Sequence, residues 1–371
     1  MEQNGNERLV VLGDLPANWR ASRSLALLPI LTIAFYSGFL SVRAQTVEPP
    51  QVSAAYNPAD IQSYRIESLS LDEPDRTRFG SLDFKGGLAL TSRNTDFGAL
   101  SGLRMPDGRS LTAVADTGFW IAAELDRDDQ SAPSRFANGR ITPLQDGVGG
   151  AVLQKWAADI EGITFSGDRA FISTEQDARV LVFPFKDGLP SGSGALFGPP
   201  IPAPRLSYSF GLEAVATLPV DQRARLGGAT LVAISEGQPT SSQPLRAFLI
   251  GEGQIAEFQI ERSGSYLTTD ADFLPSGDLV LLERHFSPVE GPHMRIRRIA
   301  VADIVPGATV DGTTLMELGP RHQIDNMEGI SVFTMPNGEV RVALVSDNNQ
   351  WLLQRTLYLE FAFPAAGLRV D

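Results

Sequence analysis

Acidic side chains recur at one place in five similar segments of the chain. Each segment starts with a polar or acidic residue, continues with an apolar run, a Pro/Gly/Asp/Asn turn and a second apolar run, and closes on another acid. The starting residues are Ser101, Glu161, Glu213, Asp270 or Asp272, and Glu328. Carboxylates brought together repel one another unless a cation lies among them, and hard oxygen ligands of this kind favour calcium.

The acids that close the segments form a second set. Its members are Asp116, Glu175, Glu236, Glu283 and Asp347. Because an antiparallel second strand returns toward the start of the first, we expect Asp347 to lie at the same mouth as Glu328. The others either face that mouth or hydrogen-bond backbone amides in turns, as acids at strand ends often do. From the two sets we predict metal ligands at Asp116, Glu161, Glu213, Asp272, Glu328 and Asp347.

The second apolar run of the fourth segment ends on Arg284 and His285. We predict a catalytic role for both: His285 as a general acid or phosphate contact, and Arg284 beside it. A purely structural histidine is the alternative. Further along, Arg295 and Arg297 fall on one face of a predicted strand and Arg298 on the other. Such a cluster is typical of a solvated face, although a guanidinium group also suits phosphate.

Other kinds of site lack the residues that they need. The three histidines, His285, His293 and His322, stand in separate settings, which argues against a histidine-rich zinc site. The chain has no cysteine, and so no thiol nucleophile. No G-x-S-x-G elbow occurs, since the Ser-Gly-Ser-Gly run at 191–194 reads as a loop. A net charge of −13, with three lysines among 31 basic residues, argues against a nucleic-acid partner.

Short β-strands are the elements that would position the acids. Apolar runs such as "TLVAIS" and "VRVALVS" are separated by Gly, Pro, Asp and Asn. No stretch of 12 residues shows a convincing helical period, so helices should be few and short. The five segments start at intervals of 60, 52, 57 and 58 residues, a period that fits a four-stranded blade.

We therefore predict an all-β fold, a β-propeller with five or six blades, spanning residues 62–371. A hairpin repeat cannot bury both faces alone, whereas radial packing of blades can. The innermost strand of every blade runs along the central channel, which would bring the starting residues to one axial ring. Residues 62–95 would supply strands that close the ring against "TLYLEFAF" near the C-terminus.

The N-terminus has the features of an export signal. Residues 25–42 carry no charge, follow Arg20 and Arg23, and lead into Val42-Arg43-Ala44, a step that a signal peptidase could cut. We predict that residues 1–44 are a signal peptide or an uncleaved N-terminal anchor, since 18 apolar residues approach the length of a membrane span. Residues 45–61 read as a linker. The protein would then be periplasmic or secreted, or membrane-anchored through residues 25–42.

The motifs, taken in order, resemble one family. They are "LSGLRMPDGRSLTAVADTG", "IEGITF" with "FISTEQ", "GLEAVATL" with "LVAISEG", "DADFLPSGDLVLLERHFS" with "MRIRRI", and "DNMEGISVF" with "LVSDNN" and "LLQRTLYLEF". Over about residues 62–365 the chain resembles the phytase-like family, described as having esterase-like activity. By analogy with propeller phytases, the resemblance implies a six-bladed, calcium-assisted hydrolase of phosphate esters.

Three functions are compatible with these residues. The first is an exported hydrolase in which carboxylates of several blades hold calcium, which binds phosphate oxygens and activates a water for in-line attack. Its partner would be a small phosphorylated or ester substrate, and no protein partner is inferred. The second is a non-catalytic propeller that binds a ligand or a protein. The third is a carboxyl-ester or lactone hydrolase that uses the same calcium site.

Overall fold

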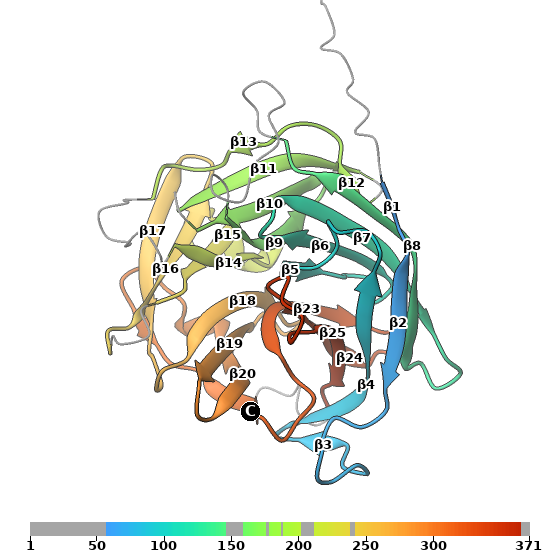
Figure 1. The fold of residues 1–371 in the computed structure, drawn as a ribbon. Coiled ribbons are helices and arrows are strands. Elements are labelled where there is room, and N and C mark those ends of the chain that lie inside the picture. Colours follow the sequence, from blue (N-terminus) through green and yellow to red (C-terminus); the bar gives the residue numbers. More distant parts are fainter. Residues whose placement is uncertain are drawn as a thin grey trace, which may run out of the picture. The chain divides into compact units, whose positions relative to one another are not determined.

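The computed structural model describes residues 57–145, 159–175, 178–186, 188–201, 211–237 and 242–364. Within these ranges the long strands form five antiparallel sheets, which are the blades of a propeller (Figure 1). The inner strands β5, β9, β14, β18 and β23 contact one another in ring order, and β23 contacts β5. The chain is therefore a five-bladed β-propeller, so the six blades implied by the family resemblance are wrong.

The five blades each run from an inner strand at the channel to outer strands at the rim. The first has β5 (Leu100–Arg104), β6 (Ser110–Ala115), β7 (Phe119–Arg127), β8 (Pro133–Pro143) and β1 (Asn57–Ala59). The second has β9 (Ile160–Ser166), β10 (Arg169–Thr174) and β11 (Arg179–Lys186), which pairs with both β12 (Leu189–Pro190) and β13 (Ala195–Leu196). The third has β14 (Leu212–Thr217), β15 (Leu231–Ser235), β16 (Leu245–Gly251), β17 (Gln254–Ile260) and β21 (Thr309–Val310).

The last two blades complete the ring. The fourth has β18 (Leu267–Phe273), β19 (Leu279–Ser287), β20 (Gly291–Ile299) and β22 (Thr313–Leu318). The fifth has β23 (Asn326–Thr334), β24 (Val340–Asp347), β25 (Thr356–Ala362), β4 (Leu82–Ser92) and β2 (Ile61–Ile66), with β3 (Arg78–Phe79) paired to β4. The described helices are α2 (Val220–Arg223) and the 3₁₀ turn η2 (Val301–Asp303), as short as the sequence predicts.

The fifth blade closes the ring with strands from both ends of the chain. Strand β25 pairs antiparallel with β4, with Leu357 opposite Ala89, as predicted from residues 62–95 and "TLYLEFAF". In Figure 1 the blue β4 lies beside the red β25. The folded part also begins earlier than expected, because β1 starts at Asn57 inside the predicted linker and pairs with β8. An added edge strand covers backbone groups of β8 that would otherwise be open.

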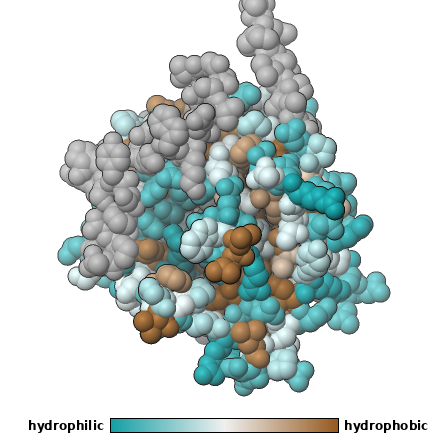
Figure 2. All heavy atoms as spheres, viewed as in Figure 1, coloured by the Kyte–Doolittle hydropathy of each residue, from teal (hydrophilic) through white to brown (hydrophobic). Residues whose placement is uncertain are grey.

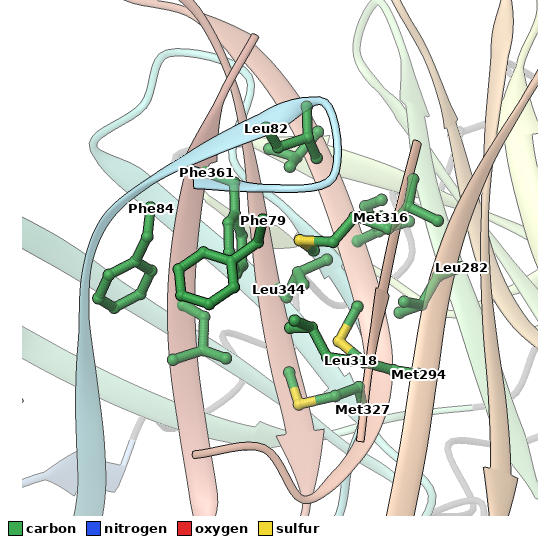
Figure 3. Packing of buried hydrophobic residues seen from close by; sticks show 14 of the residues in the cluster. Phe79, Leu82, Phe84, Leu282, Met294, Met316, Leu318, Met327, Leu344 and Phe361 are labelled. Atoms are coloured by element: carbon green, nitrogen blue, oxygen red, sulfur yellow. The ribbon is translucent and has the colours of Figure 1, made fainter. Parts of the chain in front are cut away.

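Five clusters of buried apolar side chains hold the blades together, and each lies between two neighbouring blades. Figure 3 shows the cluster between the fourth and fifth blades, with Phe79 and Phe361 on one side and Met294 and Met316 on the other. Because both faces of a blade are covered, strands such as β24 are buried along their whole length. This burial explains why many strands read as continuous apolar runs.

One buried ion pair crosses the channel axis. Arg104 of β5 donates to the Asp270 carboxylate of β18 at 2.9 Å, and its side chain is only 4% exposed. The same guanidinium donates to the carbonyl oxygens of Val215, Ala271 and Ile330, at 2.7–2.8 Å. One side chain therefore binds the inner strands of three other blades and divides the channel into two ends.

The predicted signal or anchor, residues 1–44, and residues 45–56 of the predicted linker lie outside the described residues. In the described part of the chain, no helix is long and apolar enough to cross a membrane.

Candidate metal centre

A β-bulge in the inner strand of every blade sets the direction of the candidate side chains. At the same place in each blade, the pairing of the inner strand with its neighbour shifts by one residue. The extra residues are Ser101, Glu161, Glu213, Thr269 and Glu328. A bulge bends its strand and re-aims a side chain, which is the role that it has here. The fourth starting residue is thus Thr269, and neither Asp270 nor Asp272 as expected.

The glycine after the bulge is required by close packing of the inner strands. A Cβ on Gly162 would lie 2.7 Å from the carbonyl oxygen of Glu213, and one on Gly329 would lie 3.0 Å from the amide nitrogen of Leu103. Neither contact can be relieved by moving a flexible side chain, because both involve backbone atoms. The Glu-Gly step therefore joins an acid that turns toward the channel to a residue that lets neighbouring strands approach.

These bulges open onto a cavity of about 210 Å³ at one end of the channel. Eight carboxylates line it: Asp116, Asp159, Glu161, Glu175, Glu213, Glu236, Glu328 and Asp347. We call this the acidic cavity. Within the described ranges, Arg284 is the cation that lines it, joined by Ser101, Asn326 and Asn349. Acidic groups in the wall thus far outnumber basic ones.

The structure brings most of the predicted site residues together. Five of the six predicted ligands, Asp116, Glu161, Glu213, Glu328 and Asp347, line the acidic cavity, and so does Arg284. Glu175 and Glu236 of the second set lie there as well. The antiparallel return places Asp347 directly opposite Asn326 in the pairing of β23 and β24, at the mouth where Glu328 starts, as expected.

Asp272 lies elsewhere, and its expected place in the acidic cavity is wrong. It lines a separate cavity of about 570 Å³ together with Arg104, and its carboxylate accepts the backbone N–H of Val332 at 2.8 Å. The reason is strand geometry: Asp272 lies three residues past the bulge at Thr269, so it is carried along the channel toward the other end.

Glu283 is also absent from the walls of the acidic cavity. Its carboxylate accepts from Arg295 at 2.6 Å and from Arg297 at 2.7 and 2.8 Å, and all three side chains are at most 4% exposed. Arg295 and Arg297 do share a strand face, as predicted. That face is buried against Glu283, so the expectation of a solvated face is wrong for these two arginines.

Sequence reasoning missed Asp159. It directly precedes β9, two residues before Glu161, and has a φ of +33°. This left-handed conformation is costly for a residue other than glycine and is often found at functional sites. The Asp-x-Glu spacing was visible in the sequence, but the backbone conformation that turns Asp159 into the cavity was not.

The carboxylate oxygens form two groups of metal-binding size. One consists of Asp159, Glu161 and Glu175, and the other of Glu175, Glu213 and Glu236. Within each group one oxygen per residue lies within 4.8 Å of the others. Calcium–oxygen distances are roughly 2.3–2.6 Å, so a group of this size can surround one ion. Glu175 belongs to both groups, and Glu328 to neither.

Burial and mutual repulsion oppose ionisation of these acids. Burial, and then the charge of Glu328, hold the pKa of Glu161 well above its ordinary value, while burial and the charge of Glu161 act likewise on the pKa of Glu213. Burial and the neighbouring Asp159 raise the pKa of Glu175 to about 8. Burial raises the pKa of Glu328 to about 8, despite the nearby Arg284. A cation in the cavity would favour the ionised carboxylates.

Arg284 stands where the acidic cavity meets a second cavity. Its guanidinium lies 3.3 Å from Glu236 and 3.2 Å from Glu328, and donates to the Asn326 side chain at 2.7 Å. The Nε–H of Arg284 is buried and has no hydrogen-bond partner in the described part of the chain. A buried donor without an acceptor is costly, and an oxygen of a bound substrate would satisfy it.

His285 faces away from the acidic cavity. It lines the adjoining cavity of about 600 Å³, where its ring centroid lies 5.9 Å from that of His293 on the paired strand β20. Its Nε2 atom is 3.7 Å from the Glu290 carboxylate. Arg284 lines both cavities, so of the two predicted catalytic residues Arg284 lies on the boundary and His285 lies in the adjoining cavity.

One comparison with known proteins identifies the family. The sequence profile of the family "Phytase-like: Esterase-like activity of phytase" matches residues 95–350. The chain belongs to the phytase-like family. The match covers the inner strands of all five blades and every carboxylate of the acidic cavity. A search of curated proteins found no significant match.

Several solved propellers are similar to this phytase-like protein at low identity. The PQQ-bound aldose sugar dehydrogenase of Streptomyces coelicolor is 14% identical, with 82% of this chain and 98% of that chain covered and a TM-score of 0.36. A putative gluconolactonase is 11% identical over 82% of this chain and 94% of that chain, with a TM-score of 0.38. The WD40 propeller domain of Doa1 is 10% identical over 74% and 96%, with a TM-score of 0.34. Similarity at this level does not identify a substrate.

Proposed function

We propose that this phytase-like propeller is a calcium-dependent hydrolase of phosphate esters. The observation that carries the proposal is the acidic cavity, in which eight carboxylates face one guanidinium and two groups of three share Glu175. Such a wall is unfavourable by itself, because like charges crowd in a partly buried space. Bound cations would offset this cost.

The donor set fits calcium. All of the grouped ligands are carboxylate oxygens, and no histidine lines the cavity in the part of the chain that the structure describes. Hard oxygen ligands favour calcium or magnesium, and a cavity with many carboxylates suits the higher coordination number of calcium. In the proposed site Asp159, Glu161, Glu175, Glu213 and Glu236 hold the metal, with Asp116, Glu328 and Asp347 around them.

The chain's own residues have distinct tasks in the proposed reaction. Calcium would supply positive charge for the phosphate oxygens and lower the pKa of a bound water. Arg284 would donate its unpaired Nε–H to a substrate oxygen, while Asn326 and Glu328 hold its guanidinium in place. His285, on the far side of Arg284, would protonate the oxygen of the leaving group.

The substrate and the location of the protein are part of the proposal. The substrate would be a small phosphorylated ester, a nucleic acid is not expected as a partner, and no protein partner is inferred. We also propose that residues 1–44 direct export to the periplasm or beyond, or anchor the protein through residues 25–42. Cell fractionation of the full chain, with the N-terminus of the exported form sequenced, distinguishes a cleaved signal from an anchor.

Phosphate release tests the activity. Full-length protein is stripped with a chelator, reloaded with calcium, and assayed on phytate and on a chromogenic phosphate monoester. The proposal expects release that depends on calcium and is lost in Glu175→Gln. Calcium binding without phosphate release from either substrate would reject it. If carboxyl esters and lactones are not cleaved either, the protein is a non-catalytic propeller whose blades are tied together by the metal.

A carboxyl-ester or lactone hydrolase on the same calcium site is a second candidate. The description of the family as esterase-like and the largely apolar cavity beside Arg284 favour it. The same stripped and reloaded protein is therefore assayed on 4-nitrophenyl acetate and on a simple lactone. Calcium-dependent cleavage of these compounds without phosphate release would decide for this candidate.

A further inference from the structure

The cavity that adjoins the acidic cavity has the opposite character. It measures about 600 Å³, which is within the range of small-molecule sites. Three residues, Arg284, Asn326 and Asn349, line both cavities and mark their boundary. Away from that boundary, most of the wall consists of apolar or aromatic side chains, namely His285, Phe286, Pro292, His293, Trp351 and Leu353. We call this the apolar cavity.

Large side chains of this wall are exposed at a cost in free energy. Phe286 is 68% exposed, Trp351 67% and Leu353 86%. Figure 2 shows apolar surface at the middle of the viewed face, where Figure 1 places the connection between β24 and β25. Isolated exposed apolar residues are common, but a group of them beside a polar site marks a binding surface.

The connection that carries Trp351 and Leu353 is held in a defined conformation. Asn349 and Gln350 have φ values of +45° and +51°, a costly conformation for two consecutive residues other than glycine. The Asn348 side chain accepts the Ala99 N–H at 3.0 Å. At the other end, the Arg355 N–H donates to Asp325 at 3.0 Å. The apolar side chains are thus presented by a fixed loop of the fifth blade.

We propose that the apolar cavity binds the hydrocarbon part of the substrate, so that the preferred esters carry an aromatic or branched alkyl group next to the ester. This inference rests on the proposed function. An ester group bound at Arg284 would lie on the boundary, with its anionic part in the acidic cavity and its hydrocarbon part against Phe286 and Trp351. A substrate that is anionic all round would instead place charge against these side chains.

Two phosphonates of unequal hydrophobicity test the inference without any reaction. Calorimetry on the calcium-loaded full chain compares 2-phenylethylphosphonate with ethylphosphonate, which share their anionic group. We expect the phenyl compound to bind at least about tenfold more tightly, because it alone reaches the apolar cavity. In Trp351→Ala/Leu353→Ala the difference should fall to less than about threefold.

Leu352 provides the matched control. It lies between the two altered residues and is fully exposed, but it does not line the cavity. Leu352→Ala should keep the full preference for the phenyl compound. Equal affinities for both phosphonates in the native protein would overturn the inference, and so would an equal loss of preference in Leu352→Ala.

A neutral probe separates this inference from the proposed function. 2-Naphthol is titrated with the protein in chelator, where no cation is needed, and its fluorescence reports binding. Binding that is lost in Trp351→Ala/Leu353→Ala but kept in Leu352→Ala supports the apolar cavity even if no ester is cleaved. The inference would be overturned if the probe did not bind. It would also be overturned if the protein sedimented with phosphatidylcholine vesicles and this sedimentation required Leu352 as well as Trp351 and Leu353.

Discussion

Buried carboxylates at two places along the central channel have different surroundings. Asp270 is paired with Arg104 and also accepts the Ile330 N–H at 2.9 Å. Burial raises the pKa of Asp270 to about 6 despite Arg104, which is still less than the value of about 8 for Glu175 and Glu328. In the acidic cavity eight carboxylates share Arg284 alone among the described cations that line it. A carboxylate that is paired with a cation joins blades. A crowded set of carboxylates without cations instead destabilises the fold until a ligand supplies positive charge. The difference separates structural acids from candidate ligands.

The largest expected effect follows from breaking the pair of Arg104 and Asp270. Arg104→Met leaves Asp270 buried without its cation and removes donors to three backbone carbonyls. We expect the free energy of unfolding to fall by about 3–5 kcal/mol, measured by denaturant unfolding in chelator. Arg109→Ala, which removes an exposed pair with Glu124, is the control and should change little. A loss no larger than that of the control would show that the pair does not join the blades.

Two buried glutamates sharpen the comparison, because the same substitution should have opposite signs. Glu283→Gln removes the buried carboxylate that pairs with Arg295 and Arg297, which should destabilise the protein by about 3 kcal/mol. Glu213→Gln removes one of several crowded acids, so the thermal midpoint in chelator should rise by about 2–4 °C. Calcium affinity should fall by at least about 100-fold in Glu213→Gln only. Destabilisation by both changes would mean that Glu213 is a structural acid.

The pH dependence of the calcium-free protein gives a smaller effect with a defined sign. The folded pKa values of Glu175 and Glu328, about 8, lie above the ordinary value of 4.5. Stability from such groups is fully present below about pH 4.5 and is lost as the pH rises through 8. In chelator the thermal midpoint should therefore fall between pH 6 and pH 9. With calcium the fall should disappear, since metal binding requires the ionised carboxylates; the same fall in both conditions would contradict the site.

Asp272→Asn should have the smallest effect on metal binding. Asp272 lies at the other end of the channel and accepts the Val332 N–H, a bond that an asparagine oxygen can also accept. Calcium affinity, measured by calorimetry, should change by less than about threefold. A change as large as that of Glu213→Gln would return Asp272 to the metal site.

The sequence predicts the ring of blades because its repeats have a regular period and because apolar runs reveal buried strands. It also predicts the Glu-Gly step, which the structure explains by bulges and by close strands at Gly162 and Gly329. It does not reveal which residue of the fourth blade occupies the bulge. Asp270 looked equivalent to Glu328, but the pairing of β18 with β19 places Thr269 there.

The sequence cannot separate acids with cation partners from acids without them. Glu283 and Glu236 close their segments in the same way, yet two arginines on β20 neutralise Glu283. Such pairing depends on side chains from strands that meet only in the folded blade. Asp159 was missed for a related reason, since its direction follows from one backbone angle.

Calcium titration of the chelator-stripped chain tests the central claim most directly. Native protein and Glu175→Gln are compared by calorimetry, because Glu175 belongs to both groups of carboxylates. We predict that the native protein binds at least one calcium ion per chain and that Glu175→Gln loses at least about 100-fold in affinity. The absence of calcium binding to the native protein, or unchanged binding in Glu175→Gln, would contradict the assignment of the acidic cavity as a metal centre.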